Sequence, residues 1–220
     1  AEQARVQPAI DTVVWNLQRR YNATETSTFP VVYNTYQCYL KDAPARLATD
    51  LRRAERFGYH FGAKLVRGAY LESERALALA LGYPSPVHDT IEDTHRAYNA
   101  AVEFLLRHAR TSDKQVELMV ASHNQDSVER AIAAMNAIGI DRTGPTICFA
   151  QLYGMMDHLT YNLGLHGYRA YKYVPYGPVR LVMPYLIRRA NENSSIAGAS
   201  RRELDMIGAE LKRRLRQRFQ

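Results

Sequence analysis

Short apolar segments alternate with longer segments of helical periodicity along almost the whole chain, and this alternation restricts the fold more than any other feature. Five segments rich in β-branched and aromatic residues are predicted to be strands, at 31–38, 61–66, 116–121, 146–152 and 170–174. Helical patterns are predicted at 6–17, 42–57, 72–81, 89–110, 126–138, 155–163, 179–193 and 202–219. Such alternation is typical of repeated βα units and of a parallel sheet buried on both faces.

Two architectures share this pattern, an open doubly wound sheet and a (β/α)8 barrel. An open nucleotide-binding sheet usually carries G-x-G-x-x-G after its first strand, and this motif is absent. Polar and charged residues instead gather at the C-terminal ends of the predicted strands, namely Gln37, Lys64, Arg67, Ser122, His123, Gln151 and Tyr173. A barrel builds its active site from this edge, so the pattern favours an α/β barrel of the TIM type.

The length of the chain indicates how many of the eight βα units of such a barrel it can supply. A complete barrel needs roughly 250 residues and eight strands, whereas this chain has 220 residues and five predicted strands. We therefore expect 1–220 to supply about the last five βα units of one barrel domain, with 200–220 as a terminal basic helix. The first three units would then be absent from this chain or supplied by another chain.

The net charge of +7 favours an anionic partner, which could be a ligand, a membrane surface or a nucleic acid. Five of the seven residues at 212–218 are Lys or Arg. They fit either a solvated helix end or peripheral contact with an anionic membrane. No nucleic-acid module is recognisable, so we expect no nucleic-acid partner. The two cysteines, Cys38 and Cys148, lie in apolar strands and are expected to be buried free thiols, and no metal site is expected.

An arginine pair is the first candidate for binding chemistry. On a helix, Tyr185, Arg188, Arg189 and Glu192 fall on or near one face at spacings of three and four. Guanidinium groups donate paired hydrogen bonds that suit a carboxylate ligand. The alternative is an exposed pair with an ordinary Arg188–Glu192 bridge along the helix, worth a few tenths of a kcal/mol.

Two strand ends form further candidates. The segment KLVRGAY, 64–70, places two cations before Gly68, Ala69 and an aromatic residue. Small residues there would let a flat or phosphorylated ligand approach the backbone, although an ordinary strand-to-loop turn explains the same residues. The segment ASHN, 121–124, ends a strand with a histidine, which is more often structural than catalytic.

Six segments taken together give a specific signal. They are NTYQCYLKD (34–42), GAKLVRGAYL (62–71), ASHN (121–124), QLYGM (151–155), YKYVPYGPV (171–179) and PYLIRRANENSS (184–195). In order and spacing they resemble the proline dehydrogenase family over essentially the whole chain. The wording of the first and fifth segments is similar to the eukaryotic, mitochondrial branch more than to the bacterial bifunctional enzymes.

The resemblance implies a distorted (β/α)8 barrel that binds FAD and oxidises L-proline to Δ1-pyrroline-5-carboxylate. By this resemblance, Arg188 and Arg189 clamp the proline carboxylate and Tyr173 packs on the proline ring. Leu152 and Tyr70 match residues that line the substrate pocket. Near neighbours on the same fold oxidise hydroxyproline, and resemble this segment with a smaller residue in place of Tyr173, so proline is the favoured substrate.

The resemblance also implies a set of cofactor-binding residues. Lys64 occupies the position of a basic residue beside flavin N5 and is therefore the candidate catalytic residue. Gln37 matches a strand-end glutamine that reaches the isoalloxazine, and Glu192 matches a flavin-binding residue on the arginine helix. The remaining expected FAD contacts are Arg67, Gly68, Ala69, Ser122, His123 and Gln151.

Other implications concern partners and location. The family has an early-strand lysine and a strand-end aspartate for which this chain has no counterpart, so an N-terminal fragment of the same barrel is expected as a partner. Ubiquinone is the implied electron acceptor, at the matrix side of the mitochondrial inner membrane; a bacterial member would be cytoplasmic or peripheral on the inner membrane. The alternative from a different class is a non-catalytic fragment that carries the clamp without flavin chemistry.

Overall fold

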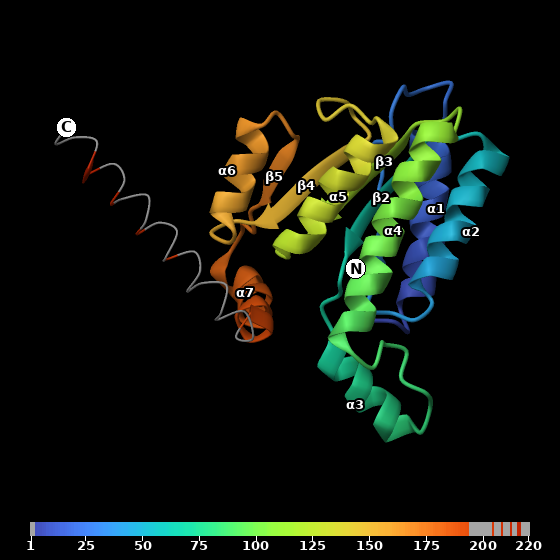
Figure 1. Ribbon diagram of the computed structural model, residues 1–220. Coiled ribbons are helices and arrows are strands. Elements are labelled where there is room, and N and C mark those ends of the chain that lie inside the picture. The colour runs from blue at the N-terminus through green and yellow to red at the C-terminus, as the bar shows by residue number, and fades with distance from the viewer. Residues whose placement is uncertain (1–2, 194–203, 205–207, 209–211, 213–214, 217–220) are drawn as a thin grey trace.

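Five parallel strands form one sheet in which the strand order follows the chain (Figure 1). The computed structural model describes residues 3–193 and, beyond them, Leu204, Gly208, Lys212, Leu215 and Arg216; the side chains of 190–193 are outside this description. The strands are β1 (Asn34–Gln37), β2 (Phe61–Val66), β3 (Val116–Ala121), β4 (Ile147–Leu152) and β5 (Ala170–Tyr173). The predicted basic helix at 200–220 lies largely outside the described residues.

Seven helices occur in the continuous part of the description, residues 3–193. They are α1 (Gln7–Tyr21), α2 (Ala43–Phe57), α3 (Leu71–Leu81), α4 (Ile91–Thr111), α5 (Gln125–Ile138), α6 (Asp157–Leu165) and α7 (Val179–Asn193). Helix α2 connects β1 to β2, α4 packs against β2 and β3, and α6 packs against β4 and β5. None of the described helices is both long and apolar enough to cross a membrane.

The strand order decides between the two architectures. Every neighbouring pair, from β1 and β2 to β4 and β5, is parallel, and the order never reverses. Because crossovers between parallel strands are right-handed, an unreversed order puts every connecting helix on the same face of the sheet. A doubly wound sheet needs a reversal that sends helices to both faces. The barrel-type expectation is therefore confirmed.

Burial along the central strands shows the same one-sided cover. In β2, β3 and β4 the last four residues alternate buried and half-buried. The buried members, such as Leu65, Val120 and Phe149, join one hydrophobic core with the inner faces of the helices. The half-buried members, such as Lys64 and Ala121, face the opposite way because side chains alternate along a strand. The second face is thus covered least toward the C-terminal ends of the strands.

A small lobe follows β2 before the chain returns through α4. Helix α3 lies beyond the C-terminal edge of the sheet, as does α7 (Figure 1). A separate small core of Tyr39, Leu40, Ala43 and Val87 holds the loops beneath α3. The buried Glu74 side chain on α3 also accepts a hydrogen bond from the Ala4 backbone N–H at 2.6 Å. The lobe is therefore anchored to the rest of the fold at more than one point.

Within residues 3–193 the predicted elements agree with the structure to within four residues at either end, and one difference, at β1, is informative. Strand β1 spans Asn34–Gln37, whereas the composition predicts a strand over 31–38. The backbone N–H groups of Val31 and Val32 donate to Oδ1 of Asn22 instead of to a neighbouring strand. Both cysteines are buried free thiols, as expected.

Asn22 joins the end of α1 to the segment before β1. Its side chain is fully buried, and its Nδ2 donates to the carbonyl oxygens of Val32 at 2.8 Å and His60 at 3.1 Å. The backbone carbonyl of Asn22 accepts a hydrogen bond from the backbone N–H of His60. One side chain therefore supplies the hydrogen bonds that a longer β1 would otherwise have to make.

We expect Asn22→Ala to lower the free energy of unfolding by about 3 kcal/mol, because buried backbone groups lose their partners. The matched control is Asn16→Ala on the same helix, where the exposed Asn16 side chain donates only to the carbonyl of Thr12. That change should alter stability by about 0.5 kcal/mol or less. Urea unfolding of both variants is the measurement, and equal losses would contradict the role assigned to Asn22.

Candidate functional site

The open face of the sheet carries most of the predicted site residues. Register pairs Lys64 with Met119 and Met119 with Cys148, so these three side chains form one row across the face. Two rows nearer the C-terminal edge, Leu152 pairs with Tyr173. Lys64, Leu152 and Tyr173 therefore lie on the same face, as their roles would require.

A chain of cations and aromatic rings crosses this face. The Lys64 Nζ lies 5.7 Å from the centre of the Tyr173 ring, which lies 5.7 Å from the ring of Tyr185. The Arg189 guanidinium in turn lies 5.2 Å from the centre of the Tyr185 ring. Distances of this size are those of cation–π contacts and tilted aromatic pairs. Residues from β2, β5 and α7 are thereby brought to one place.

The contact between Lys64 and Tyr173 also shows that the sheet is curved. Two strands separate β2 from β5, and strands lie about 4.8 Å apart, so a flat sheet would hold these strands roughly 14 Å apart. The 5.7 Å approach needs a sheet that bends round toward its open face. The face is therefore the inner, concave surface of a barrel-like arc.

Burial disfavours the protonated, charged form of the Lys64 side chain. The pKa of its ammonium is lowered, chiefly because the side chain is desolvated on the concave face. Among the described residues Lys64 makes no ion pair that would offset this. A buried cation of this kind interacts favourably with an electron-rich or anionic ligand placed beside it.

His123 lies at the C-terminal end of β3, against the end of β4. Its Nε2 accepts the backbone N–H of Leu152 at 3.0 Å, so the ring proton is on Nδ1. Burial lowers the pKa of His123 to about 4, and the nearby positive charges of Lys172, Arg189 and Arg67 act in the same direction. The ring is therefore neutral at physiological pH and fixes the position of Leu152.

Arg67 is the most completely surrounded cation of the set. Its Nε donates to Nδ1 of His95 at 3.0 Å, Nη1 to Oγ of Ser122 at 2.7 Å, and Nη2 to Oγ of Ser127 at 2.8 Å. Its guanidinium carbon lies 4.5 Å from the centre of the Tyr98 ring. Helices α4 and α5 and the end of β3 thus hold the guanidinium in one orientation.

The partners of Arg67 in this network are all neutral, and this has an electrostatic consequence. Within the described part of the chain no carboxylate lies within ion-pair distance of the guanidinium. Desolvation accordingly lowers the pKa of Arg67. A buried charge without a counter-charge is costly, and an anion reduces that cost. The donor set therefore fits a phosphate-bearing cofactor at the C-terminal edge.

The turn after Arg67 brings the backbone against an aromatic ring. A side-chain carbon built on Gly68, at φ of +144°, would lie 1.9 Å from Cδ1 of Tyr39. Glycine is thus required here by the close approach of Tyr39, which the sequence alone attributed to a ligand. Ala69 and Tyr70 are half-buried, and the Tyr70 carbonyl accepts from Ser73 Oγ and the Glu74 N–H at the start of α3.

Gln37 is buried at the edge of the sheet, beside α1. Its Nε2 donates to Oε1 of Gln7 at 3.4 Å, and Nε2 of Gln7 donates to Asp11 at 2.9 Å. Asp11 also accepts two hydrogen bonds from Arg46. Gln37 is therefore connected through α1 to α2.

Two predicted site residues, Gln151 and Arg188, are not brought into this group. Gln151 lies on the helix-facing side of β4, where its amide donates to the Ser122 carbonyl and accepts from Oγ1 of Thr160. Arg188 is exposed on α7. Glu192 belongs to α7, but its side chain lies outside the described residues.

Sequence reasoning missed His95 and Ser127 as parts of the site. They lie in the first turns of α4 and α5, far from Arg67 along the chain. The available signal was positional, since helices that follow strands of a barrel begin at the same edge as the site. Neither residue carried a motif that would have singled it out.

Comparison with known proteins gives the family. The family model described as proline dehydrogenase matches residues 1–202. The chain belongs to the proline dehydrogenase family. Two similar relatives are "Proline dehydrogenase 1, mitochondrial" of Drosophila melanogaster, 44% identical over 98% of this chain, and "Hydroxyproline dehydrogenase" of Homo sapiens, 45% identical over the same share. The match covers 32% of the first protein and 46% of the second, so this chain spans a third to a half of these relatives.

Solved structures of the family share the fold. Proline utilization A of Bdellovibrio bacteriovorus matches with a TM-score of 0.78 and 26% identity, over 87% of this chain and 19% of that one. A Bradyrhizobium japonicum homologue matches with a TM-score of 0.72 at 24% identity, which shows the likeness of fold. The arc of five strands is thus the proline dehydrogenase type of α/β fold.

The depressed pKa of His123 makes stability depend on pH. The unfolded chain binds a proton near pH 6.5, whereas folded His123 binds one only near pH 4. The contribution of His123 to stability is therefore fully present above about pH 6.5 and is lost progressively as the pH falls toward 4. We expect His123→Gln, which keeps an acceptor for the Leu152 N–H and does not titrate, to flatten this part of the unfolding profile. An NMR titration midpoint for His123 near its ordinary value would contradict the assignment.

Proposed function

We propose that the protein is a FAD-dependent proline dehydrogenase that oxidises L-proline to Δ1-pyrroline-5-carboxylate. The observation that carries the proposal is the row of Lys64, Tyr173, Tyr185 and Arg189, which places a cation on either side of two aromatic rings. A small amino acid with a carboxylate and an apolar ring has the chemistry to match such a row. Membership of the family supports the same reading.

The substrate carboxylate would be held from α7. Arg189 reaches the aromatic row, and Arg188 beside it is exposed near the same edge. Paired guanidinium groups can bind one carboxylate through parallel hydrogen bonds, which fixes both position and orientation. An amine without the carboxylate could not accept these hydrogen bonds, so the clamp also selects for an amino acid. Tyr173 would pack on the proline ring, with Leu152 and Tyr70 as further walls.

The cofactor would lie along the C-terminal edge of the sheet. Arg67 is the residue best suited to its phosphate groups, while Lys64 would lie beside the flavin ring and Gln37 would reach its edge. Gly68, Ala69, Ser122, His123 and Glu192 complete the proposed contacts. When bound, the flavin ring accepts a hydride equivalent from the carbon next to the substrate nitrogen. Lys64 would favour that acceptance as a fixed positive charge, and the clamp would hold the reacting carbon in place.

Gln151 has a different proposed part. On the helix-facing side, its amide donates to the carbonyl of Ser122, after β3, and accepts from Thr160 of α6. These two hydrogen bonds connect the end of β4 to both neighbours. Any effect of Gln151 on the cofactor would therefore act through the position of Ser122. The residue stays in the proposed site as a supporting member.

Hydroxyproline is the second candidate substrate. Two relatives named hydroxyproline dehydrogenase are 43% and 45% identical to this chain. Two relatives named proline dehydrogenase have the same identities, 43% and 45%. The bulk of Tyr173 favours proline, because an aromatic ring packed on the substrate leaves little room for a 4-hydroxyl group. Proline is therefore the substrate we propose.

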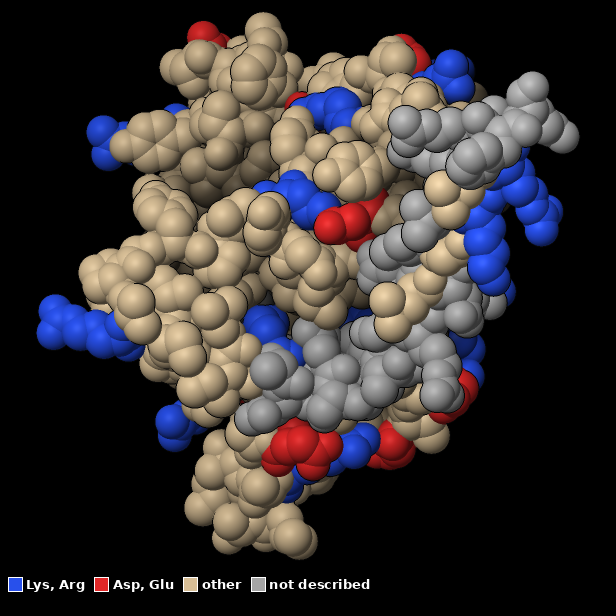
Figure 2. Space-filling model, turned by 90° about the vertical axis from the view of Figure 1, so that its left-hand side faces the viewer, with Lys and Arg blue, Asp and Glu red and all other residues tan. Residues whose placement is uncertain are grey.

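We also propose that a further segment of barrel pairs with the edges of this sheet. Within the described residues β1 pairs only with β2, and β5 only with β4. Large apolar side chains stand exposed on β5, on α7 and in the loop between them, among them Tyr173, Val174, Val179 and Leu181. The described residues on the face seen in Figure 2 are mostly uncharged. Exposed apolar edges of this kind are usually covered in a stable protein. An N-terminal portion of the same barrel is the partner that fits them.

Electron transfer and location follow from the same family assignment. We propose ubiquinone as the acceptor and the matrix side of the mitochondrial inner membrane as the site of action. The support is that relatives from fly, human and nematode are named mitochondrial. The basic segment at 212–218 would contribute peripheral contact with an anionic membrane.

The visible absorption spectrum of the purified protein tests the proposal directly. We expect a flavin band that bleaches when L-proline is added anaerobically, with little change in a parallel sample given 4-hydroxyproline. Bleaching by hydroxyproline alone would select the second candidate. A flavin band that neither substrate bleaches, or a colourless protein even after expression with an N-terminal barrel segment, would overturn the proposed activity.

Replacing Arg189 tests the carboxylate clamp. We expect Arg189→Met to raise the KM for L-proline by about a hundredfold, because a buried charge pair with the substrate is lost. Discrimination between L-proline and pyrrolidine, which lacks the carboxylate, should shrink by a similar factor. Arg180→Met, an exposed arginine at the start of the same helix, is the matched control and should change neither value.

A further inference from the structure

His95 connects the first turn of α4 to the guanidinium of Arg67. Its Nδ1 accepts the hydrogen bond from Nε of Arg67 at 3.0 Å, and this bond fixes one end of the guanidinium plane. Ser127 and Ser122 fix the other two nitrogens. Because Nε and the two terminal nitrogens lie in one plane, three acceptors from three elements determine the orientation of that plane.

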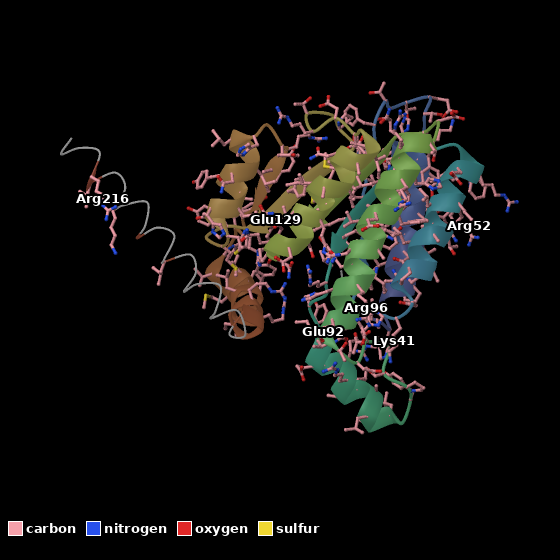
Figure 3. All side chains as sticks on the ribbon, in the orientation of Figure 1. Lys41, Arg52, Glu92, Arg96, Glu129 and Arg216 are labelled. Carbon is pink, nitrogen blue, oxygen red and sulfur yellow. The ribbon has the colours of Figure 1, made fainter. Side chains whose placement is uncertain are left out.

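The accepting nitrogen of His95 must carry no proton. A protonated imidazole donates from both nitrogens, so it would lose the bond to Arg67 and place a second positive charge 3.0 Å away. The charged groups that act on His95 are Arg67 from the end of β2, Glu92 on α4 itself, and Asp126 on α5. Glu92 and Arg96 are labelled at this end of α4 in Figure 3.

The balance of these charges favours the neutral ring. Burial and the charge of Arg67 lower the pKa of His95, and the carboxylates of Glu92 and Asp126 oppose that shift without cancelling it. The ring that holds Arg67 is therefore neutral at physiological pH. Geometry and charge agree that His95 acts on Arg67 as a hydrogen-bond acceptor.

We propose that His95 is a positioning residue that holds Arg67 ready for a phosphate of the cofactor, and that only its neutral imidazole does so. The inference rests on the proposed function, since it takes the phosphate to be that of FAD. Ser127 has the same role from α5. Two residues outside the recognised motifs would thus control how tightly the cofactor binds, without touching it themselves.

The proposal explains why the network avoids carboxylates. An aspartate or glutamate in place of His95 or Ser127 would pair with Arg67 and neutralise it before the cofactor arrived. Neutral acceptors orient the guanidinium and leave its charge for the ligand, which is the arrangement expected of a preorganised anion site. The Tyr98 ring beneath the guanidinium supports it in the same way.

Two substitutions at His95 separate its acceptor role from its bulk. Asparagine places an oxygen acceptor near the position of Nδ1, whereas leucine fills similar space and accepts nothing. Because the bond to a charged group is worth about 1.5–3 kcal/mol, we expect His95→Leu to weaken FAD binding by roughly ten- to a hundredfold. His95→Asn should stay within about threefold of the wild type, and Ser127→Ala should resemble His95→Leu.

The readout is the dissociation constant of FAD from the apoprotein, followed by quenching of flavin fluorescence. The control pair is His108→Leu and His108→Asn at the far end of α4, where His108 contacts Glu55; neither should change FAD binding. Equal binding by all variants, or equal weakening by His95→Leu and His95→Asn, would overturn the proposal. All of these proteins are expressed together with the N-terminal barrel segment, and failure of the wild-type protein to bind FAD under that condition would instead overturn the proposed function.

The pH dependence of binding gives a second, independent readout. Burial and Arg67 hold the pKa of His95 below its ordinary value, so protonation of the ring at a pH under about 6.5 should weaken FAD binding by the wild-type protein. His95→Asn should lack this loss between about pH 7.5 and pH 5, a range above the ordinary pKa values of Glu92 and Asp126. A wild-type profile that matches the asparagine variant would contradict the requirement for a neutral ring.

Discussion

The structure depends on a constraint set by the parallel sheet, which is that all of its crossovers lie on one face. Right-handed connections between strands in unreversed order put the helices on the convex side and leave the concave side to side chains of the strands themselves. The convex side is filled by one hydrophobic core, with Leu65, Leu105 and Phe149 fully buried. The concave side can therefore hold groups such as Lys64 that no core would tolerate without cost. The convex face therefore contributes the hydrophobic core, and the concave face carries the charged groups of the candidate site.

Arg67 is where the two faces meet. It follows the last residue of β2, yet its guanidinium turns toward α4 and α5 and is held by Ser122, Ser127 and His95. The helices that bury the core therefore also orient a charge at the C-terminal edge. Tyr98 shows the same double use, because its buried ring lies in the hydrophobic core and also supports the guanidinium. A change in the packing of α4 would consequently reach the site without any change in a residue of the site.

Much of this fold could be predicted from the sequence because its local signals and its tertiary packing agree. Strands β2 and β3 have the predicted bounds, and α7 begins and ends where its pattern predicts. Strand β1 is shorter than its composition predicts, since Asn22 takes the backbone hydrogen bonds of Val31 and Val32 and composition carries no sign of such a partner. The pattern at Gly68 fits a ligand-binding turn or an ordinary strand-to-loop turn, and the group that the structure brings against Gly68 is Tyr39. His95 could not be found, because an isolated histidine in a helix gains its meaning only when folding brings Arg67 to it.

Two histidines and two kinds of cation share the edge of the sheet, and only the cations carry charge there. Burial and neighbouring positive charge keep His123 neutral down to about pH 4, and they lower the pKa of His95 as well. The positive potential of the site is thus supplied by arginine and lysine and not by the imidazoles. The imidazoles serve instead as acceptors with fixed tautomers, one for Arg67 and one for the backbone of Leu152. A site built in this way keeps the charge that its anionic ligands require, and protonation of either imidazole would first disturb the geometry that the imidazole holds.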